Sequence, residues 1–177
     1  MNQQNRYTAL RGELDAGRLV RAAQQVDGLD DFGDEGFREP LDKLIDCAAR
    51  DVDFSAQGLE VFKRDLVRHL VNRLRFEHDL KQHPEILEED VSDPIIIMGL
   101  GRSGTTKLQR MLSSPDDVQK MYFWRIWNPA RVPRAGPADP ALPDPRIAAA
   151  GQAHVLTEDK PKLASVHHIE EGEVDEE

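Results

Sequence analysis

The sequence predicts an α/β protein, in which a helical N-terminal region precedes the start of a parallel β-sheet flanked by helices. Three observations predict this class. Apolar side chains recur at helical spacing over residues 1–92, a short run of β-branched residues occupies 94–98, and a glycine-rich turn at 99–104 leads into an amphipathic segment. We therefore expect a helical region over residues 1–92 and the beginning of an α/β domain over residues 93–177.

The helical region contains three predicted helices, over residues 11–25, 37–51 and 56–81. The last is the clearest, because Ser55 is a suitable N-cap and Pro84 limits the helix. Its apolar stripe is formed by Leu59, Phe62, Leu66, Leu70 and Leu74. The basic residues of this helix are expected to lie on its solvated face.

The second region changes pattern at Pro94. Residues 94–98 predict a buried strand, residues 105–112 a helix with Leu108, Met111 and Leu112 facing inward, and residues 121–124 a second strand parallel to the first. Residues 128–146 hold several of the 11 prolines and predict an extended loop, followed by a helix from residue 146 to 153.

Composition and charge exclude several classes of protein. The chain has 177 residues, a net charge of -10 and a single cysteine, Cys47. It has no run of about 20 apolar residues that could span a membrane, and one cysteine supports neither a disulfide framework nor a cysteine zinc site. We expect a cytoplasmic protein that does not bind nucleic acid, because such binders usually carry a basic surplus. Residues 101–150 nevertheless carry 8 basic and 4 acidic side chains, a local positive charge that suits a small anionic ligand.

The residues with the clearest chemistry lie between the predicted strand and the helix, over 99–106. Glycines in such a turn let the backbone approach a phosphate, and the N–H groups at the start of the helix attract anions. Gly99 and Gly104 have the spacing of a nucleotide-binding Walker A loop, but Thr105 occupies the position of its lysine. A nucleoside triphosphatase or kinase is therefore disfavoured, although it stays an alternative.

The loop Arg102-Ser103-Gly104-Thr105-Thr106 resembles the 5′-phosphosulfate loop of the P-loop sulfotransferases, a basic residue followed by Ser-Gly-Thr-Thr. The segments at 83–86, 124–129, 144–150 and 167–176 resemble the bacterial branch of that family in the same order. The resemblance covers roughly residues 55–177.

The resemblance implies that the donor is 3′-phosphoadenosine-5′-phosphosulfate and that a sulfuryl group passes to an acceptor hydroxyl or amine, with no metal. The donor site would consist of Gly101, Arg102, Ser103, Gly104, Thr105 and Thr106. Arg102 would also neutralise the leaving group, and the partner would be a small-molecule, lipid or carbohydrate acceptor.

The sequence departs from this family at three places. Gly101 stands where relatives often have proline, and Arg125 stands where many carry a glutamate that is a candidate general base. The remaining candidate bases are Glu170, Glu171, Glu173, Glu176, His167 and His168. We favour Glu173, because it aligns with an acidic position of the family.

The third departure concerns the arginine and serine that bind the 3′-phosphate in the family. They lie further downstream in relatives, beyond the last residue of this sequence. We therefore expect an incomplete sulfotransferase fold and little or no activity from these 177 residues alone. A non-catalytic remnant that acts as an interaction module is the other alternative.

Overall fold

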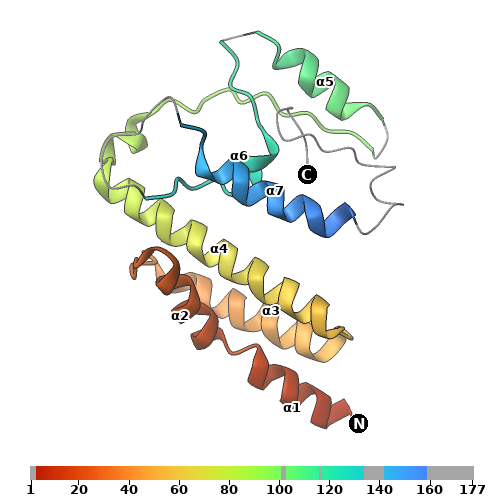
Figure 1. The fold of residues 1–177 in the computed structure, drawn as a ribbon. Helices are drawn as coiled ribbons and strands as arrows, with labels where there is room; N and C mark the ends of the chain where they lie inside the picture. Colours follow the sequence, from red (N-terminus) through yellow and green to blue (C-terminus); the bar gives the residue numbers. More distant parts are fainter. Residues whose placement is uncertain (1–2, 101–102, 116, 134–141, 159–177) are drawn as a thin grey trace. The chain divides into compact units, whose positions relative to one another are not determined.

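The computed structural model describes residues 3–100, 103–115, 117–133 and 142–158. Their regular secondary structure is helical, and no β-strand occurs among them (Figure 1). The elements are α1 (Gln3–Glu13), α2 (Ala16–Asp27), the short 3₁₀ helix η1 (Glu35–Phe37), α3 (Arg38–Asp51), α4 (Ala56–Gln82), the 3₁₀ helix η2 (Pro84–Glu88), α5 (Thr105–Leu112), α6 (Phe123–Trp127) and α7 (Pro145–Glu158). The chain divides into two compact units, Met1–Ile86 and Leu87–Glu177.

The prediction of an α/β fold with a parallel sheet is wrong. Residues 94–98 form no strand, and Ile95, Ile96 and Met98 are 66%, 75% and 89% exposed. Residues 121–124 are not a strand either, because α6 begins at Phe123. A strand needs a neighbour to pair with its backbone N–H and C=O groups. Because no described segment offers that neighbour, the β-branched run at 94–98 does not become part of a sheet.

The predicted helix over residues 11–25 is two helices that meet at Asp15. The Asp15 side chain accepts a hydrogen bond from the backbone N–H of Arg18 at 2.8 Å and so caps the start of α2. At the other end, Gly28 adopts a left-handed conformation, with φ of 71°, and donates its N–H to the carbonyl of Gln24. Both ends of α2 are therefore fixed by local contacts.

Helix α4 confirms the strongest helix prediction. The hydroxyl of Ser55 accepts a hydrogen bond from the N–H of Gly58 at 3.0 Å, which caps the helix at the predicted residue. The helix ends at Gln82, two residues before Pro84.

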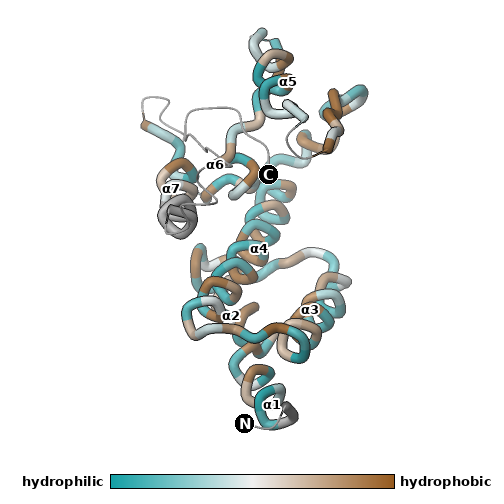
Figure 2. The backbone as a smooth tube through the Cα atoms, turned by 90° about the vertical axis from the view of Figure 1, so that its right-hand side faces the viewer, coloured by the Kyte–Doolittle hydropathy of each residue, from teal (hydrophilic) through white to brown (hydrophobic). Residues whose placement is uncertain are grey.

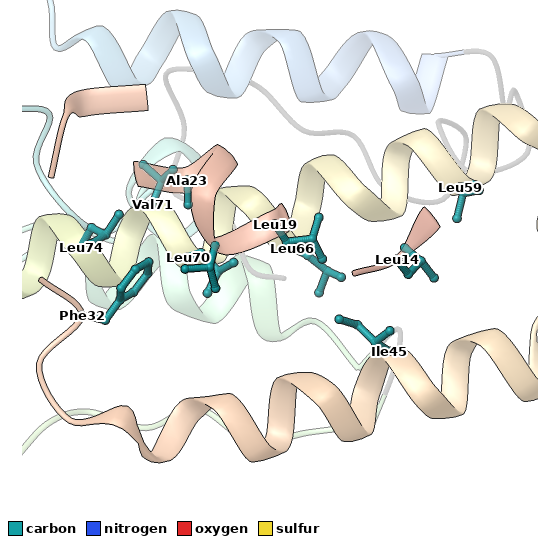
Figure 3. Packing of buried hydrophobic residues seen from close by; sticks show 11 residues of the cluster. Leu14, Leu19, Ala23, Phe32, Ile45, Leu59, Leu66, Leu70, Val71 and Leu74 are labelled. Carbon is teal, nitrogen blue, oxygen red and sulfur yellow. The ribbon is translucent and has the colours of Figure 1, made fainter. Parts of the chain in front are cut away.

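The interior of the first unit is one apolar cluster. Helix α2 packs against α3 and α4, and α1 packs against α3. Figure 2 shows hydrophobic and hydrophilic residues alternating along these helices, as amphipathic helices require. The side chains labelled in Figure 3 point into a common interior. The cluster consists of Leu14, Leu19, Val20, Ala23, Phe32, Ile45, Leu59, Leu66, Leu70, Val71 and Leu74.

Two arginines of α4 lie at contacts with other segments, not on a solvated face as predicted. Arg75 forms a two-point ion pair with Asp27 at the end of α2, with N···O distances of 2.6 and 3.2 Å. Arg73 donates to the carbonyls of Phe32 and Asp34, and its guanidinium lies 4.9 Å from the centre of the Phe37 ring. Both arginines therefore hold the segment around η1 and the end of α2 against α4.

The second unit has a smaller interior, formed where α6 packs against α7. Phe123, Asn128, Ala130 and Ala150 are buried there. Helix α5 has the predicted bounds, but its Leu108, Met111 and Leu112 are 45%, 62% and 40% exposed and do not face inward as predicted. Among the described residues, no helix is both long and apolar enough to cross a membrane.

Candidate functional site

The structure places four of the six predicted donor-binding residues together at the start of α5. Ser103 and Gly104 are exposed and immediately precede the helix, while Thr105 and Thr106 are its first two residues and are half-buried. Gly101 and Arg102 lie outside the described residues. The backbone N–H of Ser103 donates to the carbonyl of Leu100 at 3.1 Å, which closes the turn just before the helix.

Two glycines of this loop suit its geometry. A Cβ atom at Gly99 would lie 2.6 Å from the Ser103 hydroxyl and 2.8 Å from a methyl carbon of Thr105. The chain therefore folds back so that Gly99 lies against the first turn of α5. Gly104 has a φ of 90°, in the left-handed region that favours glycine.

The start of α5 is suited to an anion. Gly104 has no side chain with which to cap the helix, and among the described residues, its two chain neighbours apart, no heavy atom lies within 4 Å of the place where its Cβ would be. The first turn contains no acidic residue and includes the exposed Lys107. Backbone N–H groups at a helix start carry a partial positive charge, so an oxyanion can approach there without meeting a carboxylate of that turn.

A second cluster surrounds Trp124 in the second unit. The guanidinium of Arg146 lies 4.7 Å from the centre of the indole ring, and that of Arg125 lies 5.0 Å from it. The ring of Tyr122 is nearly parallel to the indole, with ring centres 6.1 Å apart. Two cations and two aromatic rings thus meet at this point.

Arg146 has a structural role that sequence reasoning missed. It donates to both carboxylate oxygens of Asp144, at 3.0 and 2.9 Å, and to the carbonyls of Asn128 and Pro129, at 3.3 and 2.9 Å. Asp144 also accepts the backbone N–H of Arg146 and so caps α7, which begins at Pro145. The Asp-Pro-Arg sequence could have indicated this helix start, but not the contact with residues 128–129, which are distant in sequence.

The candidate general bases at residues 167–176, Glu173 among them, lie outside the described residues. Arg125, which stands where the family often has a glutamate, lies over Trp124 and Tyr122. At the start of η2, Nδ1 of His83 lies 3.1 Å from a carboxylate oxygen of Glu85. The pKa of Glu85 is held below its usual value, mainly by its own backbone N–H and next by His83.

In the part of the chain that the structure describes, no group of three or more His, Cys, Asp or Glu side chains is placed to hold a metal ion.

Comparison with known proteins finds a similarity in structure. No protein-family model matches the chain, and no curated protein matches it in sequence. In structure, the chain is similar to sulfotransferase STF1 from Mycobacterium tuberculosis H37Rv, with a TM-score of 0.64 and 26% sequence identity. The chain resembles part of a sulfotransferase. The similarity covers 91% of this chain and 44% of that one, so the chain spans less than half the length of that enzyme.

Proposed function

We propose that this chain is part of a sulfotransferase that transfers a sulfuryl group from 3′-phosphoadenosine-5′-phosphosulfate to an acceptor hydroxyl or amine. The similarity to a sulfotransferase structure at 26% identity is the observation that carries the proposal. The open start of α5, preceded by a turn that ends in Ser103 and Gly104, supports it, because the donor is an anion that such a helix start attracts.

In this proposal each residue of the loop binds the donor and positions it. The backbone N–H groups at the start of α5 and the hydroxyls of Thr105 and Thr106 donate to the phosphosulfate oxygens, and the fork of Arg102 binds the 5′-phosphate. The bond between sulfur and the bridging oxygen breaks while the acceptor oxygen or nitrogen bonds to sulfur. Negative charge grows on the departing phosphate, where Arg102 and the fixed backbone dipoles stabilise it.

The acceptor must also lose its proton as it bonds to sulfur. We assign that step to Glu173, whose carboxylate would take the proton, because it aligns with an acidic position of the family that the chain resembles. No metal is required, since positioned hydrogen-bond donors and Arg102 supply the positive charge.

A binding titration tests the role of Arg102. We expect Arg102→Ala to weaken binding of adenosine 3′,5′-bisphosphate, the desulfated donor, by about 1.5–3 kcal/mol, because a charge-assisted hydrogen bond is lost. Arg102→Lys should restore only part of this, since a point charge replaces a fork. Isothermal titration calorimetry on the 177-residue chain measures both changes.

The control is Arg131→Ala, which removes an equal charge from an exposed position of the same unit. Affinities of the Arg102 variants equal to that of the parent would show that this arginine does not bind phosphate. A preference for ATP with magnesium over the bisphosphate would contradict the sulfotransferase proposal and favour a nucleotide hydrolase or kinase.

A further inference from the structure

Two arginines lie beside the same indole ring, and among the residues that the structure describes only Arg146 has a carboxylate partner. Arg146 is neutralised by Asp144, and its Nη1 donates to the carbonyls of Asn128 and Pro129. Arg125 lies 5.0 Å from the centre of Trp124 and 5.7 Å from the centre of Tyr122. Within residues 3–100, 103–115, 117–133 and 142–158, no side chain or carbonyl accepts a hydrogen bond from its guanidinium.

The aromatic rings fix the position of the Arg125 guanidinium. A guanidinium on an aromatic face is held by attraction to the ring and by apolar contact, and these contacts leave its N–H edge free to donate in its own plane. Arg125 is half-buried, on a helix that begins at Phe123 and packs against α7. The side chain is therefore ordered before any ligand arrives, which lowers the entropy that binding must offset.

The charges nearby favour an anion as the occupant. Asp144, the carboxylate beside this cluster, already binds Arg146 through both of its oxygens. Arg146 with Asp144 forms a neutral pair, so the cluster as described carries one positive charge, on Arg125. The planar fork of an arginine matches two oxygens of a carboxylate, phosphate or sulfate.

We propose that Arg125, held over Trp124 and Tyr122, binds an oxyanion through two parallel N–H···O hydrogen bonds. The oxyanion has two possible sources, a phosphate of the nucleotide donor or an anionic group on the acceptor, and both present the same chemistry to the fork. This proposal does not depend on sulfuryl transfer, since it concerns binding of an oxyanion at α6.

The two tryptophans of the chain provide a direct measurement. Trp127→Phe leaves Trp124 as the single indole and keeps an aromatic ring beside Phe123, which stacks on Trp127 at 5.6 Å. In this background we expect inorganic phosphate, titrated at constant ionic strength, to change the fluorescence of Trp124 with a dissociation constant on the order of millimolar. Calorimetry of the same titration measures binding independently of the fluorescence.

Three variants in that background test the site. Arg125→Gln should weaken phosphate binding about tenfold or more, and Arg125→Lys should weaken it several-fold, because the fork is lost while the charge stays. Arg131→Gln, which removes an equal charge from an exposed residue, should bind like the parent. Circular dichroism of each variant establishes that the helices are intact, and the lysine variant decides the outcome if the glutamine variant does not fold.

A second titration distinguishes the sources. If saturating adenosine 3′,5′-bisphosphate abolishes the effect of phosphate on Trp124 fluorescence, the oxyanion belongs to the donor. If phosphate still changes the fluorescence in the presence of bound bisphosphate, the oxyanion belongs to the acceptor. Both results support the site. The proposal is overturned if Arg125→Gln or Arg125→Lys binds phosphate as tightly as the parent, or if Arg131→Gln loses as much affinity as Arg125→Gln. The phosphate titrations of the Arg125 and Arg131 variants do not involve Arg102, so failure here is separable from failure of the proposed function.

Discussion

Single residues of α4 show what a pattern of hydrophobicity leaves out. The apolar stripe predicted for this helix lies in the core as expected, with Leu66, Leu70 and Leu74 buried. The pattern also assigned the basic residues to solvent, yet the Arg75 and Asp27 side chains are only 11% and 15% exposed. Their pairing joins residues 48 positions apart, and periodicity within one helix carries no information about such a partner.

Removing one partner of this pair should be costly. We expect Asp27→Ala to lower the free energy of unfolding by about 3 kcal/mol, because the arginine is left largely buried without its carboxylate. Urea unfolding followed by circular dichroism measures this change. Glu35→Ala is the control, because it breaks an exposed ion pair in which the Arg38 and Glu35 side chains are 51% and 59% exposed. This substitution should lower the free energy of unfolding by less than about 1 kcal/mol. Equal losses in the two variants would show that burial does not set the strength of the Arg75–Asp27 pair.

At the scale of elements, helices α3 and α4 could be predicted, whereas neither predicted strand forms. A helix is determined by nearby residues, such as the cap at Ser55 and the proline at 84, so its ends can be located in the sequence. The run at 94–98 has the composition of a strand, but a strand exists only where another segment pairs with it. The candidate site shows the same difference. The glycines of the loop at 99–106 could be predicted, because their role depends on neighbouring residues. The contact of Arg146 with residues 128–129 could not, because it joins segments that are distant in sequence.

The contact between α1 and α3 contains a polar pair that should respond to pH. The Tyr7 hydroxyl donates to Asp46 at 2.6 Å. This hydrogen bond lowers the pKa of Asp46 below 3.8 and raises the pKa of Tyr7 above 10.0. The ionised Asp46 therefore stabilises the fold at pH values above the pKa that this group has in the unfolded chain. This stability is lost as the pH falls through the lower pKa of Asp46 in the folded protein. Tyr7 contributes stability below its unfolded pKa, and this is lost as the pH rises through the folded value.

We expect Tyr7→Phe to remove part of the stability near neutral pH and to flatten both ends of the stability profile. Hydrogen exchange of the α1 amides as a function of pH measures the effect where it arises. Thr8→Ala, at an exposed neighbouring position of α1, is the comparison variant and should keep the slope of the parent. A phenylalanine variant with the same pH dependence as the parent would show that the Tyr7–Asp46 hydrogen bond does not contribute to stability.

At the scale of the whole molecule, the division of the chain into Met1–Ile86 and Leu87–Glu177 predicts two unfolding processes. The apolar cluster of the first unit is formed by residues of that unit alone, and both tryptophans lie in the second.

We expect Leu74→Ala, at a side chain only 1% exposed, to destabilise the first unit by about 3 kcal/mol, because it leaves a cavity in the core. In urea, the transition seen by circular dichroism should then move to lower concentration, since most helical residues belong to the first unit, while the tryptophan fluorescence transition stays where the parent has it. Leu87→Ala, at a position 75% exposed, should move neither transition. Equal shifts of both probes in Leu74→Ala would show instead that the two units unfold together, and the boundary after Ile86 would then carry no thermodynamic meaning.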